Sequence, residues 1–409
     1  MRTLTLPEHG QLPDVALDLA DVDVLAPYCP RQLTLTPDFS GDGYVLAAGS
    51  WVGTIRTPSV ALVIEPKVAL SQLLFLLSYT IDPHRWRDMP FDYQATASLA
   101  EAIIPGFVHQ VRRAIRQGLL HGYRSHRDTL TTVRGRVELP EQLRRHYGRS
   151  PPVEVAYDEF TDDMVENRLL KAAIYRLSRL RLRSASSRGG LRTLASAFDR
   201  VAHVAYDPRG LPEIAYTRLN QHYRPAVELA RLILRATSFD LAHGAVRSSA
   251  FLVDMNQVFE AFVVVALREA LDADERSFPT ATRAPSLRLD DARKVPIKPD
   301  LTWLQHSRPV FVGDVKYKAL GGTDHQNADL YQALAYTVAT GLSDAVLIYA
   351  AGEVEQATHS ISSVGKRLHV RTLNLAATPD GILKQVRRLA TDIRSLVERS
   401  ARPGSPTAA

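Results

Sequence analysis

The first 95 residues alternate short apolar runs with glycine and proline. Runs such as 44–47 and 60–64 have the length and residue types of β-strands. The turns between such runs are marked by Gly41, Gly43, Gly49, Gly53 and Pro58. One stretch, from about residue 70 to residue 79, has the apolar content of a helix instead. This part of the chain is therefore predicted to be β-rich with one helix.

From about residue 98 to residue 242 the apolar positions recur at spacings of three and four, which is the period of one helix face. The ranges with this spacing are 97–117, 164–182, 191–204 and 221–236. Gly189-Gly190 and the segment 207–210 are turn signals between these ranges. We therefore expect a mainly helical middle region.

The last part of the chain begins near Phe251 and mixes the two periods. Asp254, followed by Gln257, has the form of a helix N-cap with its reciprocal partner, and a buried helix is expected at 258–271. Strands are expected at 287–289, 301–304, 310–317, 345–349 and 368–373, and helices at 326–340 and 382–397. This order of elements is typical of an α/β domain.

These patterns predict an α+β multidomain protein, in which a β-rich and helical N-terminal region is followed by a C-terminal α/β domain. The chain has 409 residues, and a single core usually stops growing at about 250–300 residues. The expected divisions are a β-rich domain at 1–97, a helical and basic region at 98–245, the α/β domain at 246–400 and a disordered tail at 401–409.

Composition excludes several classes of protein. The chain has no run of eighteen apolar residues, and its N-terminus lacks the basic-then-apolar order of a signal peptide. A cytoplasmic protein without membrane contact is therefore expected. Cys29 is the only cysteine, which excludes an internal disulfide framework and a zinc site built on several thiolates. A metal ion would have to be held by carboxylates or histidines.

Charge is unevenly distributed along the chain. Residues 1–66 contain eight Asp and Glu against three Arg, whereas residues 112–149 contain ten Arg against three acids. An acidic start suits a protein partner better than DNA, and a basic middle suits a phosphate backbone, although ordinary solvated helix faces would give the same counts.

Lysine is scarce, yet four of the eight lysines lie between residues 294 and 318. A compact ammonium with a tunable pKa is therefore expected to have a use there.

The strand expected at 310–317 carries the candidate chemistry. Its period of two puts Asp314 and Lys316 on one face, roughly 7 Å apart at their Cα atoms. Asp300 precedes the neighbouring strand and can meet Asp314 beside it. Two carboxylates suit Mg²⁺, which lowers the pKa of a bound water, while a lysine orients that water or stabilises a phosphodiester transition state. Asp300, Asp314 and Lys316 are thus the expected catalytic residues, and Glu260 is an expected third metal ligand.

A helix after this strand places Asp329, Gln332 and Tyr336 on one face, where Gln332 and Tyr336 are suited to brace the lysine or touch the DNA backbone. The alternative without catalytic function is an exposed hairpin in which Asp314 and Lys316 form an ordinary ion pair.

A second copy of the same residue pattern occurs near the N-terminus. Pro37-Asp38 is followed by Glu65-Pro66-Lys67. We expect this copy to be a decoy, because Pro66 cannot donate to a strand ladder and no acid-bearing helix precedes it.

The motifs of the chain, in their order and spacing, resemble those of the McrC family, the nuclease subunit of modified-cytosine-dependent restriction systems. The matching segments are 52–55, 64–68, 134–137, 157–160, 166–171, 218–220 with Tyr223, 255–256, 259–260, 298–300, 314–318 and 329–336. Before residue 50 we find no motif of the family.

This resemblance implies a C-terminal PD-(D/E)xK domain of the restriction-endonuclease type and an N-terminal partner-docking region. Lys298 and Lys318 then join Glu260, Gln332 and Tyr336 as supporting residues of the site. The implied partner is a McrB-like AAA+ GTPase ring that recognises the modified base, and the implied substrate is double-stranded DNA containing 5-methylcytosine. Double-strand cutting takes two strand-cleaving events, so two copies of the subunit are expected to meet.

Two other functions stay open at this point. The chain could be a non-enzymatic adaptor that docks an AAA+ ring to DNA, but that role predicts the loss of a core residue, and all three are present. It could also be a stand-alone repair nuclease of the RecB-like kind, which would cut DNA without a GTPase.

Overall fold

The structure is a computed structural model that describes residues 1–39, 43–91, 98–147, 149, 151–242, 245–317, 323–350 and 356–401. The chain forms two compact units, one made of residues 1–89 and 239–409 and the other of residues 90–238. The boundaries expected near residues 97 and 245 lie close to these limits, and the three-domain division itself stays a prediction. No helix in the described part is both long enough and apolar enough to cross a membrane.

The first unit begins with two sheets that share one core. The larger has the strand order β1-β6-β5-β11-β10 and the smaller β2-β4-β3. Leu6, Ile55 and Leu62 of the larger sheet pack with Leu33 and Leu46 of the smaller. The elements are β1 (Arg2–Pro7), β2 (Gln11–Val15), α1 (Leu19–Leu25), η1 (Ala26–Tyr28), β3 (Leu33–Pro37), β4 (Tyr44–Ala48), β5 (Trp51–Arg56), β6 (Val60–Glu65), α2 (Leu70–Ile81) and η2 (Trp86–Asp88). The strands expected at 44–47 and 60–64 and the helix at 70–79 are confirmed.

The chain returns to this larger sheet almost two hundred residues later. After β10 (Thr237–Ala242), strand β11 (Ala245–Asp254) pairs antiparallel with β5, so that Leu252 lies opposite Gly53. Gly53 has φ +137°, and a Cβ there would lie 2.0 Å from the carbonyl oxygen of Phe251, which explains why glycine occupies this position. The pairing joins the N-terminal sheet to the segment that leads into the C-terminal part.

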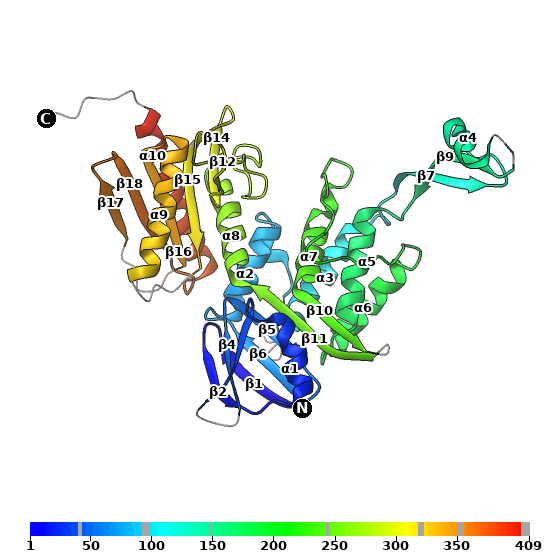
Figure 1. Cartoon of the computed structure of the whole chain (residues 1–409), viewed down its shortest axis with the longest axis horizontal. Coiled ribbons are helices and arrows are strands. Elements are labelled where there is room, and N and C mark those ends of the chain that lie inside the picture. Colours follow the sequence, from blue (N-terminus) through cyan, green and yellow to red (C-terminus); the bar gives the residue numbers. More distant parts are fainter. Residues whose placement is uncertain are drawn as a thin grey trace. The chain divides into compact units, whose positions relative to one another are not determined.

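The rest of the first unit is a mixed sheet with helices on both faces (Figure 1). Its strand order is β14-β15-β16-β18-β17, with the three central strands parallel and both edge strands antiparallel. Helix α9 packs on β15, β16 and β18, while α8 and α10 pack on each other and on the same sheet. The elements are α8 (Met255–Ala270), β12 (Leu287–Arg288), β13 (Pro296–Ile297), β14 (Leu301–Gln305), β15 (Arg308–Lys316), α9 (Thr323–Thr340), β16 (Asp344–Ala350), β17 (Ala357–Ile361), β18 (Lys366–Leu373) and α10 (Pro379–Ala401).

All expected strands and helices of this C-terminal part are confirmed. The N-cap of α8 is Asp254, whose side chain accepts from the backbone N–H of Asn256. The edge strand β17 was not predicted, because its sequence, Ala357–Ile361, has mostly small and polar residues and is largely exposed.

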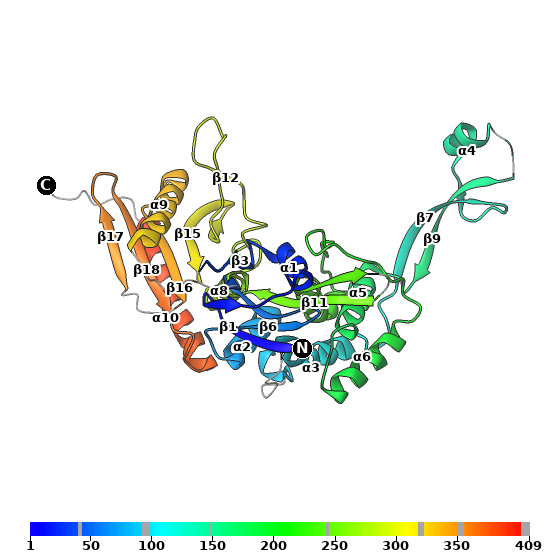
Figure 2. The ribbon, with the colours of Figure 1, turned by 60° about the horizontal axis from the view of Figure 1, so that its bottom comes forward.

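The second unit combines helices with a long antiparallel ribbon. The elements are α3 (Leu99–Ala114), β7 (Gly122–Leu130), β8 (Arg136–Val137), α4 (Leu139–His146), β9 (Val153–Thr161), α5 (Val165–Ser178), α6 (Ala185–Ala197), η3 (Gln221–Tyr223) and α7 (Arg224–Ala236). Helices α3, α5, α6 and α7 pack together, and β7 and β9 carry β8 and α4 at their far end (Figure 2).

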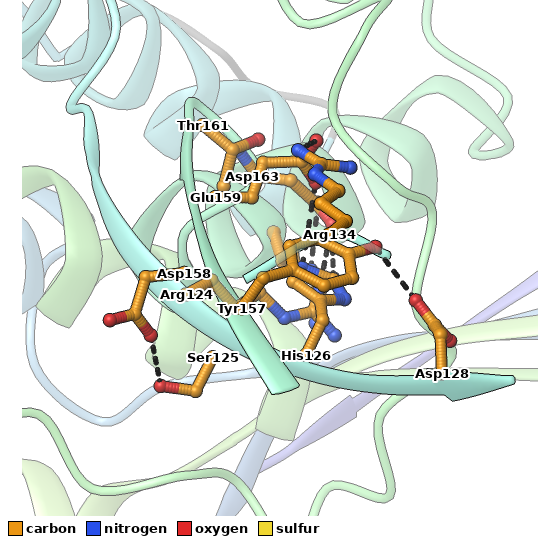
Figure 3. A network of polar contacts seen from close by, with 11 residues as sticks. Arg124, Ser125, His126, Asp128, Arg134, Tyr157, Asp158, Glu159, Thr161 and Asp163 are labelled. Carbon is orange, nitrogen blue, oxygen red and sulfur yellow. Dashed lines mark hydrogen bonds and ion pairs between the residues drawn. The ribbon is translucent and has the colours of Figure 1, made fainter. Parts of the chain in front are cut away.

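The expectation of a mainly helical middle region is therefore wrong for residues 122–130, 136–137 and 153–161, which form the three-stranded sheet β7-β9-β8. Apolar and polar residues do not alternate clearly along this ribbon. Its strands are held together by pairs of polar side chains instead (Figure 3). Ser125 donates to Asp158 at 2.6 Å, and Tyr157 donates to Asp128 at 2.7 Å. The guanidinium of Arg134 lies over the ring of Tyr157, 3.9 Å from its centre. Strands whose paired side chains are polar do not show the alternation of apolar residues by which strands are predicted from sequence.

Helix α6 also differs from its prediction. It was expected at 191–204, after a turn at Gly189-Gly190, but it spans Ala185–Ala197 and contains both glycines. Ser184 caps it by accepting from the backbone N–H of Ser187. A Cβ at Gly190 would lie 3.3 Å from both methyl groups of Val108 on α3, so this glycine allows close helix packing and does not mark a turn. The turn expected at 207–210 is confirmed by the hydrogen bond from Gly210 N to Asp207 O.

Candidate active site

Strand pairing brings the two candidate aspartates together. β14 and β15 are antiparallel, with Leu301 opposite Gly313, so Asp300, the residue before β14, lies beside Asp314. β15 is parallel to β16, and a Cβ at Gly313 would lie 2.6 Å from the carbonyl oxygen of Val346. A glycine immediately before Asp314 therefore lets the two strands approach closely. The predicted meeting of Asp300 and Asp314 agrees with this register.

Both carboxylates are fixed by hydrogen bonds. Asp300 Oδ2 accepts from the backbone N–H of Val315 at 2.9 Å. The hydroxyl of Tyr336, on α9, lies 3.3 Å from Asp314 Oδ1 and 3.2 Å from the backbone oxygen of Lys298, and it can donate to either. Asp314 is 1% exposed. Its orientation is thus determined by the helix that covers the sheet. Tyr336 was expected to brace Lys316 or touch DNA, and it contacts Asp314 instead.

The carboxylates of this site repel one another. Burial raises the pKa of Asp300 to about 8, with repulsion from Asp314 and then from Glu260 adding to the shift. Burial also raises the pKa of Glu260, again with a contribution from Asp314. A site in which two buried acids have raised pKa values is one that a bound cation would stabilise.

Lys316 is surrounded by three acceptors. Its ammonium forms an ion pair with Asp314 Oδ2, donates to Gln332 Oε1 at 3.0 Å and lies 3.8 Å from Asp329 Oδ1. Burial works against this ammonium, but the interactions with Asp314 outweigh burial and raise its pKa above the ordinary value. The lysine therefore stays protonated at neutral pH, with its position set by β15 and α9 together.

A residue outside the sequence prediction completes this arrangement. Tyr349, on β16, donates to Asp329 Oδ2 at 2.9 Å, and both residues are buried. The sequence predicts Asp329 only through its spacing on the helix, and Tyr349 only as the last residue of the strand expected at 345–349. The pairing of β16 with β15, which the sequence does not specify, is what brings Tyr349 here.

The metal-ligand prediction is only partly assembled. Asp314 Oδ2 is buried and has Lys316 as its ion-pair partner, and Asp314 lies close enough to Asp300 to raise the pKa of Asp300. Within the same residues, however, no three His, Cys, Asp or Glu side chains are grouped so as to hold a metal ion. Asp300 and Asp314 thus fit a cation that keeps several waters, while Glu260 lies near them without completing a set of three. Lys298 is exposed, and Lys318 lies outside the described residues.

The decoy pattern near the N-terminus is not assembled into a comparable site. Asp38 accepts from the backbone N–H of Asp14 at 3.0 Å, and β6 ends at Glu65, before Pro66. The backbone N–H of Lys67 donates to Glu8 Oε2 at 3.2 Å.

Glu8 is a buried acid that the sequence did not single out. Its side chain is 0% exposed, and the hydroxyl of Tyr317, directly after Lys316, donates to its Oε2 at 3.2 Å. Burial raises the pKa of Glu8, although the bonds from Lys67 and Tyr317 work against the shift. No periodicity signals this contact, because it joins residues 309 positions apart.

Fold and site together define a mixed α+β protein that carries two carboxylates and a lysine on neighbouring strands of a helix-covered sheet. The chain belongs to the family described as McrBC 5-methylcytosine restriction system component, whose sequence profile matches residues 46–350. This confirms the family resemblance found in the motifs.

Two solved structures are similar to the chain. One is a chain of the refined half-complex from the tetradecameric assembly of Thermococcus gammatolerans McrB AAA+ hexamers with bound McrC, with a TM-score of 0.52, 20% identity, and coverage of 96% of this chain and 100% of that chain. The other is from the cryo-EM structure of the Thermococcus gammatolerans McrBC complex, with a TM-score of 0.40, 23% identity, and coverage of 66% of this chain and 88% of that chain. The first shows a shared fold. No curated protein matches the chain.

Proposed function

We propose that this chain is the Mg²⁺-dependent endonuclease subunit of a restriction complex that acts on DNA containing modified cytosine. The observation that carries this proposal is the grouping of Asp300, Asp314 and Lys316 on β14 and β15, braced by Tyr336 and Gln332 of α9, in a chain of the McrBC family. That constellation is the one expected of a PD-(D/E)xK nuclease, and it supports phosphodiester hydrolysis over a purely structural role.

In this mechanism Asp300 and Asp314 would hold the metal ion, with Glu260 close enough to contribute through space. The ion would supply an activated water and neutralise charge on the scissile phosphate. Tyr336 orients Asp314, and the backbone N–H of Val315 orients Asp300. Lys316 keeps its proton at neutral pH, so it serves as a cation that orients the water or stabilises the charge of the transition state.

The partner in this proposal is a McrB-like AAA+ GTPase ring. The solved assembly with the same fold contains McrB AAA+ hexamers with bound McrC. We extend that arrangement to this chain, in which the ring recognises the modified cytosine, hydrolyses GTP with stimulation from this subunit and delivers double-stranded DNA. Two copies of the subunit would meet to cut both strands.

A reconstituted cleavage assay tests this function. The purified chain is combined with the ring, GTP, Mg²⁺ and DNA with or without cytosine methylation, and each component is left out in turn. We expect cutting only in the complete mixture with methylated DNA, and none when Asp314→Asn replaces the wild-type chain. Robust cutting of plain DNA by the isolated chain would favour the stand-alone nuclease, and GTP hydrolysis without any cutting would favour the adaptor.

A further inference from the structure

A basic loop lies directly before the candidate site in the chain. It spans residues 287–298, which comprise strands β12 and β13, the turn that joins them and Lys298. This segment contains four cations and two acids. Arg293, Lys294 and Lys298 are exposed, and no ion pair joins any of them to an acid within the described residues. The β12 segment contacts α9, the helix that packs on β15. The loop therefore presents unneutralised positive charge next to the sheet that carries the site.

This loop is closed by its own hydrogen bonds. Asp290 Oδ1 accepts from the backbone N–H of Val295 at 2.7 Å, and Oδ2 accepts from that of Lys294 at 3.1 Å. These bonds lower the pKa of Asp290, so its carboxylate stays ionised. Arg293 has φ +56° and donates its backbone N–H to Asp290 O at 3.0 Å. One of the two acids is thus used inside the loop, and the backbone that carries Arg293 and Lys294 is held in a defined turn.

The base of the loop is tied to the candidate site. Strand β13 continues through Lys298 and Pro299 into Asp300, and Ile297 packs against the core between the sheet and α9. Tyr336 lies within hydrogen-bonding distance of both the Lys298 backbone oxygen and the Asp314 carboxylate. One side chain therefore fixes the loop's base and a catalytic carboxylate at the same time.

The electrostatics of the site give this loop a role. A carboxylate only accepts hydrogen bonds, so Asp300, Asp314 and Glu260 offer a DNA phosphate no donor of their own. A polyanion that is to be cut there needs cations around the acids, and Lys298 lies close enough to Glu260 for their charges to interact. The loop supplies such cations on the side of the site where the chain enters β14.

We infer that the loop at 287–298 is a phosphate-binding element that holds the DNA backbone at the cutting site through Arg293, Lys294 and Lys298. This inference rests on the proposed function and adds to it the surface by which the nuclease part itself binds DNA. The contacts are to phosphates, so the loop positions DNA and does not read its sequence. Cytosine recognition stays with the partner ring.

The test is a DNA-binding titration of the full chain without divalent metal. Binding is measured by the fluorescence anisotropy of labelled DNA, and the titration is repeated over a series of salt concentrations. The double variant Arg293→Ala/Lys294→Ala removes two cations from the loop and keeps Asp290, which closes it. The matched control is Lys384→Ala/Arg388→Ala, which removes one lysine and one arginine from exposed positions of α10. We expect the loop variant to bind DNA about ten to a hundred times more weakly at low salt, with a salt slope smaller by about two, because each lost phosphate contact releases one counterion fewer. The control should bind like wild type.

Equal affinity and equal salt slope in wild type and loop variant would overturn the inference. So would a loop variant that binds DNA normally but no longer binds the GTPase ring, since the loop would then contact an acidic protein surface. Failure of the proposed function is a separate result: it is read from the wild-type cleavage assay with the ring, whereas the binding titration needs neither ring nor cutting.

Discussion

The chain contains the same residue pattern twice, and only one copy is assembled into a site. Asp300 with Asp314 and Lys316 and, near the N-terminus, Asp38 with Glu65 and Lys67 both have an acid after a proline and then an acid two positions before a lysine. In the first copy the acids come from adjacent antiparallel strands and a helix covers them. In the second copy Asp38 bonds to the backbone of Asp14, and the lysine follows the end of its strand.

The difference shows that this residue pattern forms a site only where neighbouring elements supply partners for its acids and its lysine. Lys316 is held between Asp314, Gln332 and Asp329, and its ammonium is buried enough for those acceptors to set its protonation. At the second copy Lys67 donates its backbone N–H to Glu8, and its charge acts on the same acid. Tyrosines make the same point, since Tyr336 and Tyr349 brace the first copy from two different elements.

The largest expected effect comes from the residues of the first copy. Asp300→Ala, Asp314→Ala and Lys316→Ala should each lower DNA cleavage by on the order of a thousandfold or more, because each removes a metal ligand or the cation at the transition state. Ring binding and GTP hydrolysis should persist in all three. The measurement is the rate of cleavage of methylated DNA in the reconstituted complex.

Glu65→Ala and Lys67→Ala are the matched controls for that experiment. Both should cut at close to the wild-type rate once the protein is folded and assembled. A folded Lys67→Ala protein that binds the ring normally and fails to cut would transfer the catalytic role to the second copy.

Much of this site could be predicted from the sequence because its main parts are local. The period of a strand is enough to put Asp314 and Lys316 on one face, and the period of a helix is enough to align Gln332 with Tyr336. Tyr349 and Glu8 could not be predicted, since their places depend on which strands pair and on a contact between chain segments 309 positions apart. The ribbon at 122–161 was missed for another reason: its cross-strand pairs, such as Ser125 with Asp158, are polar.

A smaller effect is expected from Asp329 and Tyr349, which lie beside Lys316 and help to position it. Asp329→Asn and Tyr349→Phe should lower the cleavage rate about ten- to a hundredfold with little change in DNA affinity, because they orient a catalytic group without touching DNA. Steady-state kinetics that separate kcat from KM would measure this. Asp344→Asn is the control, since Asp344, at the start of β16, is also buried but pairs with Arg367 and His369. If Asp344→Asn lowers kcat as much as Asp329→Asn does, the effect is general loss of stability.

The contact between Glu8 and Tyr317 should have a weaker effect still. Tyr317→Phe and Glu8→Gln are each expected to reduce cleavage less than tenfold, because the bond steadies the end of β15 rather than the reacting groups. The coupling free energy of unfolding between the two changes should be about 1 kcal/mol. Thermal or denaturant unfolding of the two single variants and the double variant measures it. Strictly additive effects would show that the bond does not contribute.

The remaining expected effect is on the pH dependence of stability and not on cleavage. The pKa of Asp300 in the folded protein, about 8, lies above its ordinary value, so the folded state binds more protons than the unfolded state between the two. Without divalent metal, stability should therefore fall as pH rises through this range. Asp300→Asn should raise Tm at pH 8.5 more than at pH 6, because the amide carries no charge and can still accept from Val315 N. An identical change in Tm at both pH values would contradict the assigned titration.

The most direct test of the account is to find where the chain binds a divalent metal. Crystals of the protein soaked in Mn²⁺, which substitutes for Mg²⁺ at oxygen sites, would reveal the ion by anomalous scattering. The account predicts a peak between the carboxylates of Asp300 and Asp314 in the wild-type protein, and its loss in Asp314→Asn. A peak beside Glu65 and Lys67, or a peak that persists in Asp314→Asn, would contradict the claim that the first copy of the pattern is the metal centre.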